Sequence, residues 1–223
     1  MLINIRASVR TDLDQAVADG EKTKYDKKLA SILAVATEVF ADEGYDRASI
    51  RAVAERAGIS VAGLYYYVSS KEELLYLIQF HAFDELVRRF QDGRQALADP
   101  ADQLRLLIRN HLERFLGNMA ELVVCSREID RLVGDYRQQI EAKHREYFGL
   151  ALGLFRELAN QSEETVDPRT AALAMFGSIN WVHTWYRPET GPSAAQMAED
   201  LVQLYLRGVS PGSSGTRSDK EHR

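Results

Sequence analysis

Apolar side chains recur at every third or fourth position along most of this chain, which is the spacing of one face of an α-helix. The first such stretch spans residues 26–42. Its expected core positions are Leu29, Ile32, Leu33, Ala36 and Phe40. The same spacing predicts helices over residues 70–90, 100–115, 121–132 and 135–158. No stretch alternates as a half-buried strand does, so the predicted fold class is all-α.

Residues 49–75 indicate two short helices joined by a tight turn and followed directly by a third. Ser49 and Ser60 can each cap a helix by accepting a hydrogen bond from an unpaired backbone N–H. Gly58 can adopt the left-handed conformation that ends the first helix, and Ser70 with Glu73 has the spacing of a capping box. The positions expected to face inward are Ile50, Val53, Ala54 and Ala57 on the first helix and Val61, Leu64 and Val68 on the second.

Proline and glycine mark the helix ends in the middle of the chain. Gly93 and Pro100 interrupt the apolar pattern, and Asp99 before Pro100 is typical of a helix start. The core positions expected after this start are Leu104, Leu107, Ile108, Leu112 and Phe115. Gly117-Asn118 then separates this helix from the next one.

The last third of the chain begins with a similar signal at Asp167-Pro168. The helix that it opens is expected to contain residues 177–188. Ser193 and Gln196 form a further capping box, which opens a final helix that ends at Gly208. Residues 209–223 are rich in glycine, serine and charge and are expected to be a disordered tail.

The composition is that of an ordinary soluble protein, with 45% hydrophobic and 27% charged residues. The single Cys125 excludes an intramolecular disulfide and fits a reducing compartment. No signal-peptide run occurs, and no stretch approaches the roughly 18 apolar residues of a membrane span. We therefore expect a cytoplasmic protein with no membrane partner.

A helix–turn–helix of this kind lays its second helix in the major groove of double-stranded DNA. Ser49 and Lys71 lie at helix N-termini, where phosphates bind, and Arg51 lies near the groove edge. Tyr65 and Tyr66 can reach phosphates or base edges, whereas Tyr67 is equally suited to packing. Small side chains on the second helix favour contacts to thymine methyl groups. The candidate DNA-binding residues are Ser49, Arg51, Ser60, Val61, Ala62, Tyr65, Tyr66 and Lys71.

The net charge of −5 gives little support to DNA binding by bulk electrostatics. Residues 22–75 carry as many acidic as basic side chains. Affinity must therefore come from a local arrangement of Arg51, Lys71 and the N-terminal lysines. Residues 1–23 form either a minor-groove arm or a frayed tail. The basic residues that an arm would use are Arg6, Arg10, Lys22 and Lys24.

The DNA-binding signature of TetR-type transcriptional repressors resembles residues 48–67 (ASIRAVAERAGISVAGLYYY) and 70–75 (SKEELL). The resemblance extends upstream through residues 29–45, LASILAVATEVFADEGY. It departs at Val68, where the family usually has phenylalanine. The family implies a homodimer held by its last two long helices. The apolar face available for this contact comprises Ala171, Ala172, Met175, Phe176 and Ile179.

The segment GSINWVHTWYRP, residues 177–188, is similar to one subset of this family, whose members regulate fatty-acid, phenylacetate and sterol catabolism. Many of these respond to acyl-CoA thioesters, so the resemblance implies a small hydrophobic effector of that class. The subset often has a G-x-F-R segment before the Asp-Pro pair, and residues 160–166 lack it.

The candidate ligand-binding residues each have a structural alternative. Trp181 and Trp185 share a helix face and line either an effector tunnel or an apolar interface. Arg187 and Arg131 either receive a carboxylate or phosphate or remain solvated ion-pair partners. Asn180 in an apolar helix requires a hydrogen-bond partner. The candidate set is Asn180, Trp181, Trp185, Arg187, Arg131 and Tyr147.

An enzymatic function is not expected. The five histidines are scattered without a metal-binding pair, no phosphate-binding glycine loop occurs, and Cys125 lies in an apolar run. We therefore predict no metal and no cofactor. The expected organisation is an arm (1–23), a helix–turn–helix domain (24–75), a ligand-binding and dimerisation domain (76–208) and a tail (209–223).

The expected function is a repressor that binds a pseudo-palindromic operator as a homodimer and is released by its effector. Three alternatives stay open at this point. The protein could activate transcription, it could respond to a drug or aromatic compound, or it could bind ligands without specific DNA binding.

Overall fold

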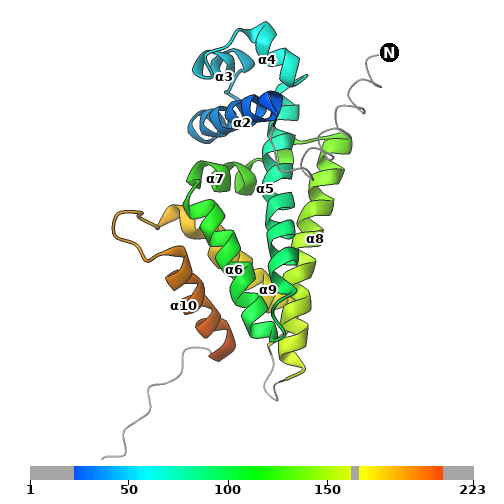
Figure 1. The fold of residues 1–223 in the computed structure, drawn as a ribbon, viewed down its shortest axis with the longest axis vertical. Helices are drawn as coiled ribbons and strands as arrows, with labels where there is room; N and C mark the ends of the chain where they lie inside the picture. Colours follow the sequence, from blue (N-terminus) through cyan, green and yellow to red (C-terminus); the bar gives the residue numbers. More distant parts are fainter. Residues whose placement is uncertain (1–22, 162–165, 208–223) are drawn as a thin grey trace, which may run out of the picture. The chain divides into compact units, whose positions relative to one another are not determined.

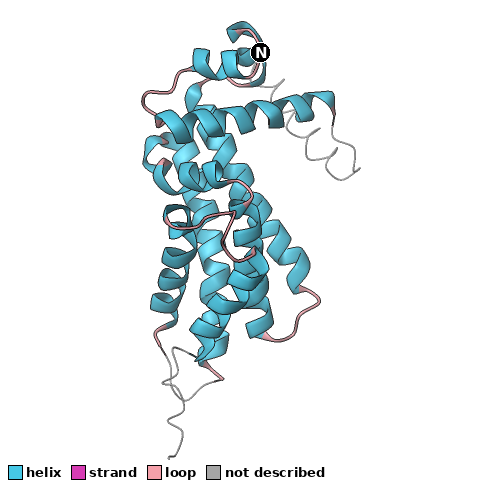
Figure 2. Ribbon diagram, turned by 90° about the vertical axis from the view of Figure 1, so that its left-hand side faces the viewer, coloured by secondary structure: helices cyan, strands magenta, loops and turns pink. Residues whose placement is uncertain are grey.

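The computed structural model describes residues 23–161 and 166–207, and all regular elements in these ranges are helices (Figures 1 and 2). The predicted all-α fold is confirmed. The described helices are α2 (Lys24–Glu43), α3 (Ile50–Arg56), α4 (Val61–Tyr67), α5 (Lys71–Arg94), α6 (Pro100–Leu116), α7 (Met119–Arg127), η1 (Ile129–Arg131), α8 (Gly134–Ala159), α9 (Pro168–Asn180), η2 (Trp181–Thr184) and α10 (Ala194–Arg207), where η marks a 3₁₀-helix. Of the helices in these two ranges, none is long and apolar enough to cross a membrane. The predicted arm residues Arg6, Arg10 and Lys22, and the predicted tail, lie outside the described residues.

The chain divides into two compact units, which we describe separately. The first unit holds the residues up to 82 together with residues 123–141, and the second holds residues 83–122 and those from 142 onward. Helices α5, α7 and α8 each have one end in each unit. These units do not follow the predicted boundary after residue 75, because residues 123–141 pack with the N-terminal helices.

Helix α2 begins earlier than predicted because Thr23 and Asp26 form a capping box. The Thr23 hydroxyl accepts from the Asp26 N–H at 3.2 Å, and the Asp26 carboxylate accepts from the Thr23 N–H at 2.9 Å. At the other end the chain turns at Gly44, where φ is +77°. Local hydrogen bonding therefore fixes both ends of this helix.

The helix–turn–helix has the capping that the sequence predicts. Ser49 Oγ accepts from the Ala52 N–H at 3.1 Å and starts α3, and Ser60 Oγ accepts from the Gly63 N–H at 3.0 Å and starts α4. Gly58 between them has φ +64°, the left-handed conformation that favours glycine. These predictions are confirmed.

Helix α5 is capped at its start and runs further than predicted. Ser70 Oγ accepts from the Glu73 N–H at 3.0 Å, but the Glu73 carboxylate accepts from the N–H and hydroxyl of Ser69 rather than from Ser70. The helix also continues through Gly93, so the predicted break there is wrong. A Cβ at Gly93 would lie 2.8 Å from Cδ2 of Leu106, so this glycine allows α6 to approach closely.

The core of the first unit joins the helix–turn–helix to residues 123–141. Its members come from α2 to α5 and from α7, η1 and α8. Polar contacts reinforce the packing. The Tyr76 hydroxyl donates to Oε1 of Gln139 at 2.7 Å, and the Val133 N–H donates to Oε1 of Glu72 at 2.8 Å. The fully buried core residues are Ile32, Ala36, Val39, Val53, Leu64, Val68, Leu74, Leu75, Val124, Leu132 and Ile140.

In the second unit, α6 starts at the predicted Asp99 cap and packs against α9 and α10. The apolar positions predicted on α6, from Leu104 to Phe115, are all buried. Helix α7 begins at Met119, earlier than predicted, because the Asn118 side chain accepts from the Glu121 N–H at 3.2 Å.

Helix α9 starts at the predicted Asp167 cap but ends at Asn180, well before residue 188. A short 3₁₀-helix follows over Trp181–Thr184, and Trp185 has φ −126°, outside any helix. Because a 3₁₀-helix has about three residues per turn, the prediction that Trp181 and Trp185 share a helix face is wrong. The final helix opens at Ser193, whose hydroxyl accepts from the Gln196 N–H at 3.1 Å.

The apolar face of α9 that was predicted to contact a second chain lies mainly inside the second unit. Ala172, Met175 and Ile179 are 0% exposed, and the Phe176 ring lies 5.3 Å from that of Tyr147. These side chains fill the core, so the prediction that they form an interface is wrong. Helical spacing identified an apolar face but did not show what covers it.

Candidate nucleic-acid interface and effector site

Helix α4 presents an exposed face to solvent. Ser60, Val61, Ala62, Tyr65 and Tyr66 are all exposed, and Tyr66 is 72% exposed. The prediction that Val61 faces inward is wrong, because its side chain is 36% exposed. The side chains of Leu64 and Val68 are the ones buried in the core. The exposed side chains are those expected of a helix that enters the major groove.

The start of α3 adds a second part to this surface. Ser49 and Arg51 are both exposed. The Ser49 and Ser60 hydroxyls accept capping hydrogen bonds, and each can still donate its own proton to a phosphate oxygen. Five exposed side chains are therefore available for contact with DNA: Ser49, Arg51, Ser60, Tyr65 and Tyr66.

The sequence predicts that Lys71 contacts a phosphate, but in the structure its ammonium group binds backbone carbonyl oxygens. Its Nζ donates to the carbonyl oxygens of Tyr45, Asp46 and Ala48 at 2.8, 3.3 and 3.0 Å. It also lies 4.4 Å from the centre of the Tyr45 ring. The three N–H donors of the ammonium are occupied in tying the α2–α3 turn to α5, so we assign Lys71 a structural role.

An aromatic cluster joins the start of α2 to the end of α4. The Tyr25 ring centre lies 6.0 Å from that of Tyr66 and 5.0 Å from that of Tyr67. An open groove beside these rings is lined by Lys24, Tyr25, Lys27, Lys28, Ser31, Tyr66 and Tyr67. The sequence predicts that the N-terminal lysines contribute to DNA affinity and also places Lys24 in a possible arm. The structure places Lys24, Lys27 and Lys28 in the first turns of α2, beside Tyr66.

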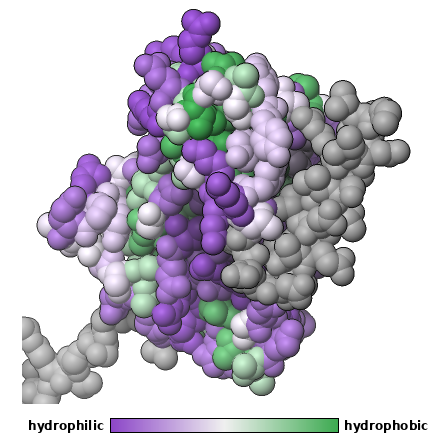
Figure 3. Space-filling model, turned by 45° about the horizontal axis from the view of Figure 1, so that its top comes forward, coloured by the Kyte–Doolittle hydropathy of each residue, from purple (hydrophilic) through white to green (hydrophobic). Residues whose placement is uncertain are grey.

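The surface of the molecule carries no single large apolar area on the face drawn in Figure 3, where hydrophobic patches alternate with hydrophilic side chains. The exposed face of α4 offers polar and aromatic side chains, and the lysines at the start of α2 line a groove with Tyr66 and Tyr67. This arrangement fits a chain whose net charge is −5.

Two of the predicted ligand residues, Tyr147 and Asn180, each interact with His111 in the core of the second unit. Tyr147 on α8 is 2% exposed, and its hydroxyl lies 3.4 Å from Nδ1 of His111 on α6. Burial lowers the pKa of His111 to about 3, and interaction with the Asn180 side chain opposes this with a smaller effect. The structure therefore gathers Tyr147 and Asn180 around His111, a residue that sequence reasoning did not select.

The other predicted ligand residues lie elsewhere. Trp181 and Trp185 are 63% and 53% exposed, and Arg187 is also exposed, with Nη1 donating to the Tyr186 carbonyl at 3.0 Å. Arg131 belongs to the first unit, where its Nη2 lies 2.9 Å from a carboxylate oxygen of Asp46. The structure does not show these four side chains in one site.

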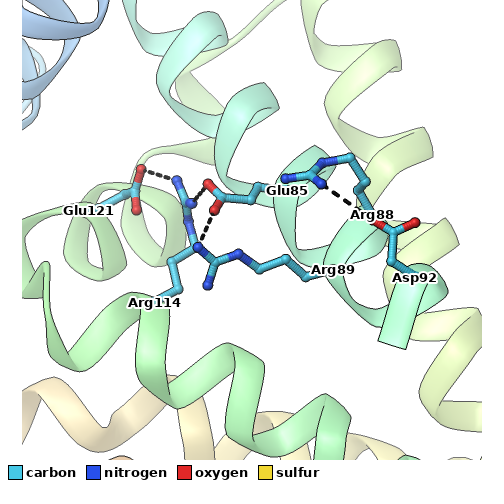
Figure 4. Close-up of polar contacts among 6 residues, drawn as sticks. All are labelled: Glu85, Arg88, Arg89, Asp92, Arg114 and Glu121. Atoms are coloured by element: carbon cyan, nitrogen blue, oxygen red, sulfur yellow. Dashed lines mark hydrogen bonds and ion pairs between the residues drawn. The ribbon is translucent and has the colours of Figure 1, made fainter. Parts of the chain in front are cut away.

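A partly buried ion-pair network lies in the second unit (Figure 4). The Arg114 guanidinium lies between two carboxylates, bonding Glu85 through Nη1 and Glu121 through Nη2, the latter at 2.8 Å. Burial raises the pKa of Glu121, and the Arg114 charge opposes this rise. Among the described residues no cluster of histidine, cysteine and acidic side chains could hold a metal ion.

Two family models match the chain. Residues 32–76 match the bacterial regulatory proteins of the tetR family, and residues 97–209 match the tetracyclin repressor-like C-terminal domain. The second match alone covers about half of the chain. The chain therefore belongs to the TetR family of DNA-binding transcriptional regulators, which are not enzymes.

Several characterised regulators are similar over most of their length. The fatty acid metabolism regulator protein of Bacillus subtilis (strain 168) is 24% identical over 82% of this chain and 95% of its own. The repressor KstR2 of Mycobacterium tuberculosis (strain H37Rv) is 25% identical over 80% of this chain and 90% of its own. The crystal structure of AibR with isovaleryl coenzyme A and operator DNA superposes with a TM-score of 0.70, at 26% identity, over 79% of this chain and 97% of that one.

Proposed function

We propose that this protein is a repressor that binds a pseudo-palindromic operator as a homodimer and leaves it when a hydrophobic effector, an acyl-CoA thioester, binds. The observation that carries the proposal is the exposed face of α4, held by the Ser60 cap and the Gly58 turn in a helix–turn–helix of the TetR family. Two such helices one helical turn of DNA apart read two half-sites.

The proposed DNA contacts fall into two groups. Tyr66, Val61 and Ala62 on α4 contact base edges and thymine methyl groups, since they are the exposed side chains of the helix that enters the groove. The hydroxyls and cations at helix starts contact phosphates and fix the register. These phosphate contacts are Ser49, Arg51, Ser60, Tyr65, Lys24, Lys27 and Lys28.

The proposed dimer uses the exposed side of α9 rather than its buried side. Leu173 is 54% exposed and Trp181 is 63% exposed, and the small residues Ala174, Gly177 and Ser178 between them are exposed as well. Small side chains allow the backbones of two helices to approach closely. Helix α10 extends this surface, because the Tyr205 hydroxyl donates to Ser178 Oγ at 2.8 Å and Leu204 is 44% exposed.

The effector class is supported by relatives. AibR binds isovaleryl coenzyme A in its crystal structure, and a FadR from Bacillus subtilis has been crystallised with stearoyl-CoA. In this chain the core of the second unit, which contains Tyr147 and Asn180, is proposed to take the acyl chain. Release from DNA follows if the effector binds the DNA-incompetent conformer more tightly, since a ligand shifts an equilibrium only by that difference.

The test is binding of the purified protein to its own upstream DNA at fixed salt, with and without straight-chain acyl-CoA thioesters of increasing length. Specific binding that one thioester abolishes supports the whole proposal. Specific binding that a thioester strengthens, with higher transcription in a reporter, indicates an activator. Binding that no thioester changes rejects this effector class. Failure to bind any fragment in a genome-wide selection indicates a ligand-binding module.

A further inference from the structure

The core of the second unit contains a polar cluster enclosed by aromatic rings. His111 is 1% exposed, and its ring is nearly parallel to that of Tyr147, with 6° between the planes and 6.1 Å between the centres. Phe115 lies 4.7 Å from His111, and Phe176 lies 5.3 Å from Tyr147. Three helices, α6, α8 and α9, thus place two polar side chains where apolar ones would be expected.

The hydrogen bonding of this cluster is incomplete. The contact from the Tyr147 hydroxyl to Nδ1 of His111 is 3.4 Å, longer than an ordinary hydrogen bond. Nε2 of His111 is closed to solvent and has no hydrogen-bond partner. A buried polar atom without a partner destabilises the folded protein, so such an atom calls for a function.

The chemistry of the free atom follows from the charge state. Burial lowers the pKa of His111 to about 3, so the imidazole is neutral at physiological pH. Burial also raises the pKa of Tyr147, so its hydroxyl keeps its proton and can donate to Nδ1. In the tautomer that accepts this proton at Nδ1, the single proton of the neutral ring lies on Nε2, a buried donor without an acceptor within hydrogen-bond distance.

We infer that His111, with Tyr147 and Asn180 beside it, binds an uncharged oxygen, a keto or hydroxyl group, carried on the apolar chain of the effector. The inference rests on the proposed effector site and names the chemical class of its ligand. A plain hydrocarbon chain leaves the donor unpaired. A carboxylate has to lose its hydration without a positive charge to compensate it.

This selection also connects binding to a change of conformation. Nε2 of His111 has no access to solvent, so an effector reaches it only when the surrounding rings separate. The bound form therefore differs from the form described above. A ligand that satisfies the donor favours the separated form, which is the differential affinity that release from DNA requires.

The test compares six-carbon acyl groups that differ only in their oxygen: hexanoyl, 3-oxohexanoyl, 5-oxohexanoyl and adipoyl, each as the CoA thioester and as the N-acetylcysteamine thioester. Calorimetry gives the affinities for the full-length protein. We expect one oxo group to bind about tenfold more tightly than hexanoyl, and adipoyl to bind more weakly than that oxo group. In Tyr147→Phe and His111→Leu the preference for the oxo group over hexanoyl should fall to about twofold or less.

A stability measurement separates a ligand site from a structural one. Without ligand, the thermal midpoint of the double variant Tyr147→Phe/His111→Leu should equal or exceed that of the wild type, because it removes both members of a poorly paired buried contact. Tyr76→Phe is the matched control. It removes a buried tyrosine hydroxyl that is fully bonded, 2.7 Å from Gln139, and it should lower the midpoint and leave the preference unchanged.

The outcomes distinguish the inference from the proposed function. If CoA thioesters bind but hexanoyl binds as tightly as both oxo groups, the inference is wrong and the proposed effector class stands. If only the N-acetylcysteamine thioesters bind, with an oxo preference that His111→Leu removes, the inference stands without coenzyme A. A preference that both single variants retain, a midpoint of the double variant clearly below wild type, or no binding of any thioester overturns the inference.

Discussion

Tyr66 is the most exposed of the three consecutive tyrosines on α4, and it is 72% exposed. Because its side chain is mostly exposed and its ring packs beside Tyr25 and Tyr67 at the surface, Tyr66→Ala should change the free energy of unfolding by less than about 0.5 kcal/mol. Operator affinity should fall about tenfold or more, as expected for loss of a groove contact. Fluorescence anisotropy with labelled operator measures the affinity, and equal operator affinity for variant and wild type would exclude Tyr66 from the interface.

For Lys71 we expect the opposite result, in which a substitution lowers the stability of the protein. Lys71→Met leaves the carbonyl oxygens of Tyr45, Asp46 and Ala48 without their donor. The free energy of unfolding should therefore fall by about 1–3 kcal/mol. Thermal unfolding without DNA is the measurement, and Arg51→Met, at an exposed side chain on α3, is the control. A variant with unchanged stability but weaker operator binding would restore the phosphate role.

Individual residues differ in how far sequence alone predicts their position. Ser49, Gly58 and Ser60 were predictable because their roles depend on backbone groups a few residues away. Val61, Lys71 and His111 were not. Their positions depend on which neighbouring elements cover a face, and neither periodicity nor charge along the chain contains that information.

At the scale of elements, the start of α2 supplies positive charge for DNA binding that the net charge of −5 does not provide. Lys24, Lys27 and Lys28 line one groove with Tyr66. If all three contact phosphates, changing them to glutamine should reduce the slope of log affinity against log salt by about 2.7, at roughly 0.9 per contact. Titrations at several salt concentrations give the slope. Arg88→Gln, on α5 of the second unit, should leave it unchanged, and a triple variant with the wild-type slope would contradict the assignment.

The Arg114 network holds α5, α6 and α7 together in the second unit (Figure 4). Arg114→Met leaves Glu85 and Glu121 without their cation, and we expect it to destabilise the protein by about 3 kcal/mol. Arg88→Met is the matched control. It breaks an ion pair with Asp92 in which both side chains are more than 60% exposed, so it should cost less than about 1 kcal/mol. Denaturant unfolding compares the two variants, and equal losses would contradict this account.

Arg114→Met should also change how the stability of the protein depends on pH. Burial raises the pKa of Glu121, and Arg114 opposes that rise, so Arg114→Met should raise the pKa further. A carboxyl group whose pKa is raised on folding destabilises the protein when ionised, and this penalty disappears as pH falls and the group takes a proton. The difference in thermal midpoint between variant and wild type should therefore be smaller at pH 5 than at pH 8. A difference that does not decrease on acidification would show that Glu121 is not the group left unpaired.

Helix starts were more predictable than helix ends. The caps at Asp99, Asp167 and Ser193 open helices where the sequence predicts them, since a cap is a local hydrogen bond. The ends at Arg94 and Asn180 differ from prediction. Gly93 stays helical because of its contact with Leu106 on a different helix, and the turn of the chain to 3₁₀ geometry after α9 has no signal in local composition.

At the scale of the whole molecule, the proposed function requires effector binding in the second unit to be coupled to DNA binding by the first. The helices α5, α7 and α8 each contribute to both compact units, so they are the covalent routes by which a change in the second unit reaches the first. An effector that alters the packing of α6, α8 and α9 around His111 acts on one of these routes directly, because Tyr147 lies on α8. Coupling of this kind is reciprocal, so operator DNA should weaken effector binding by the factor by which effector weakens DNA binding.

The proposed binding to a pseudo-palindromic operator also requires the proposed dimer, because one head alone reads one half-site. Gly177→Arg places a long charged side chain on the exposed side of α9, where the backbones of two chains are proposed to meet. Nothing lies within 4 Å of a Cβ built at Gly177, so the monomer should keep its fold and thermal midpoint within a few degrees. Analytical ultracentrifugation at micromolar concentration should show a monomer, and operator affinity should fall by about a hundredfold or more, since the second half-site contact is lost. Thr190→Arg adds the same charge at an exposed position in the loop after η2 and serves as the control. A Gly177→Arg protein that stays dimeric and binds its operator normally would show that the two chains meet elsewhere.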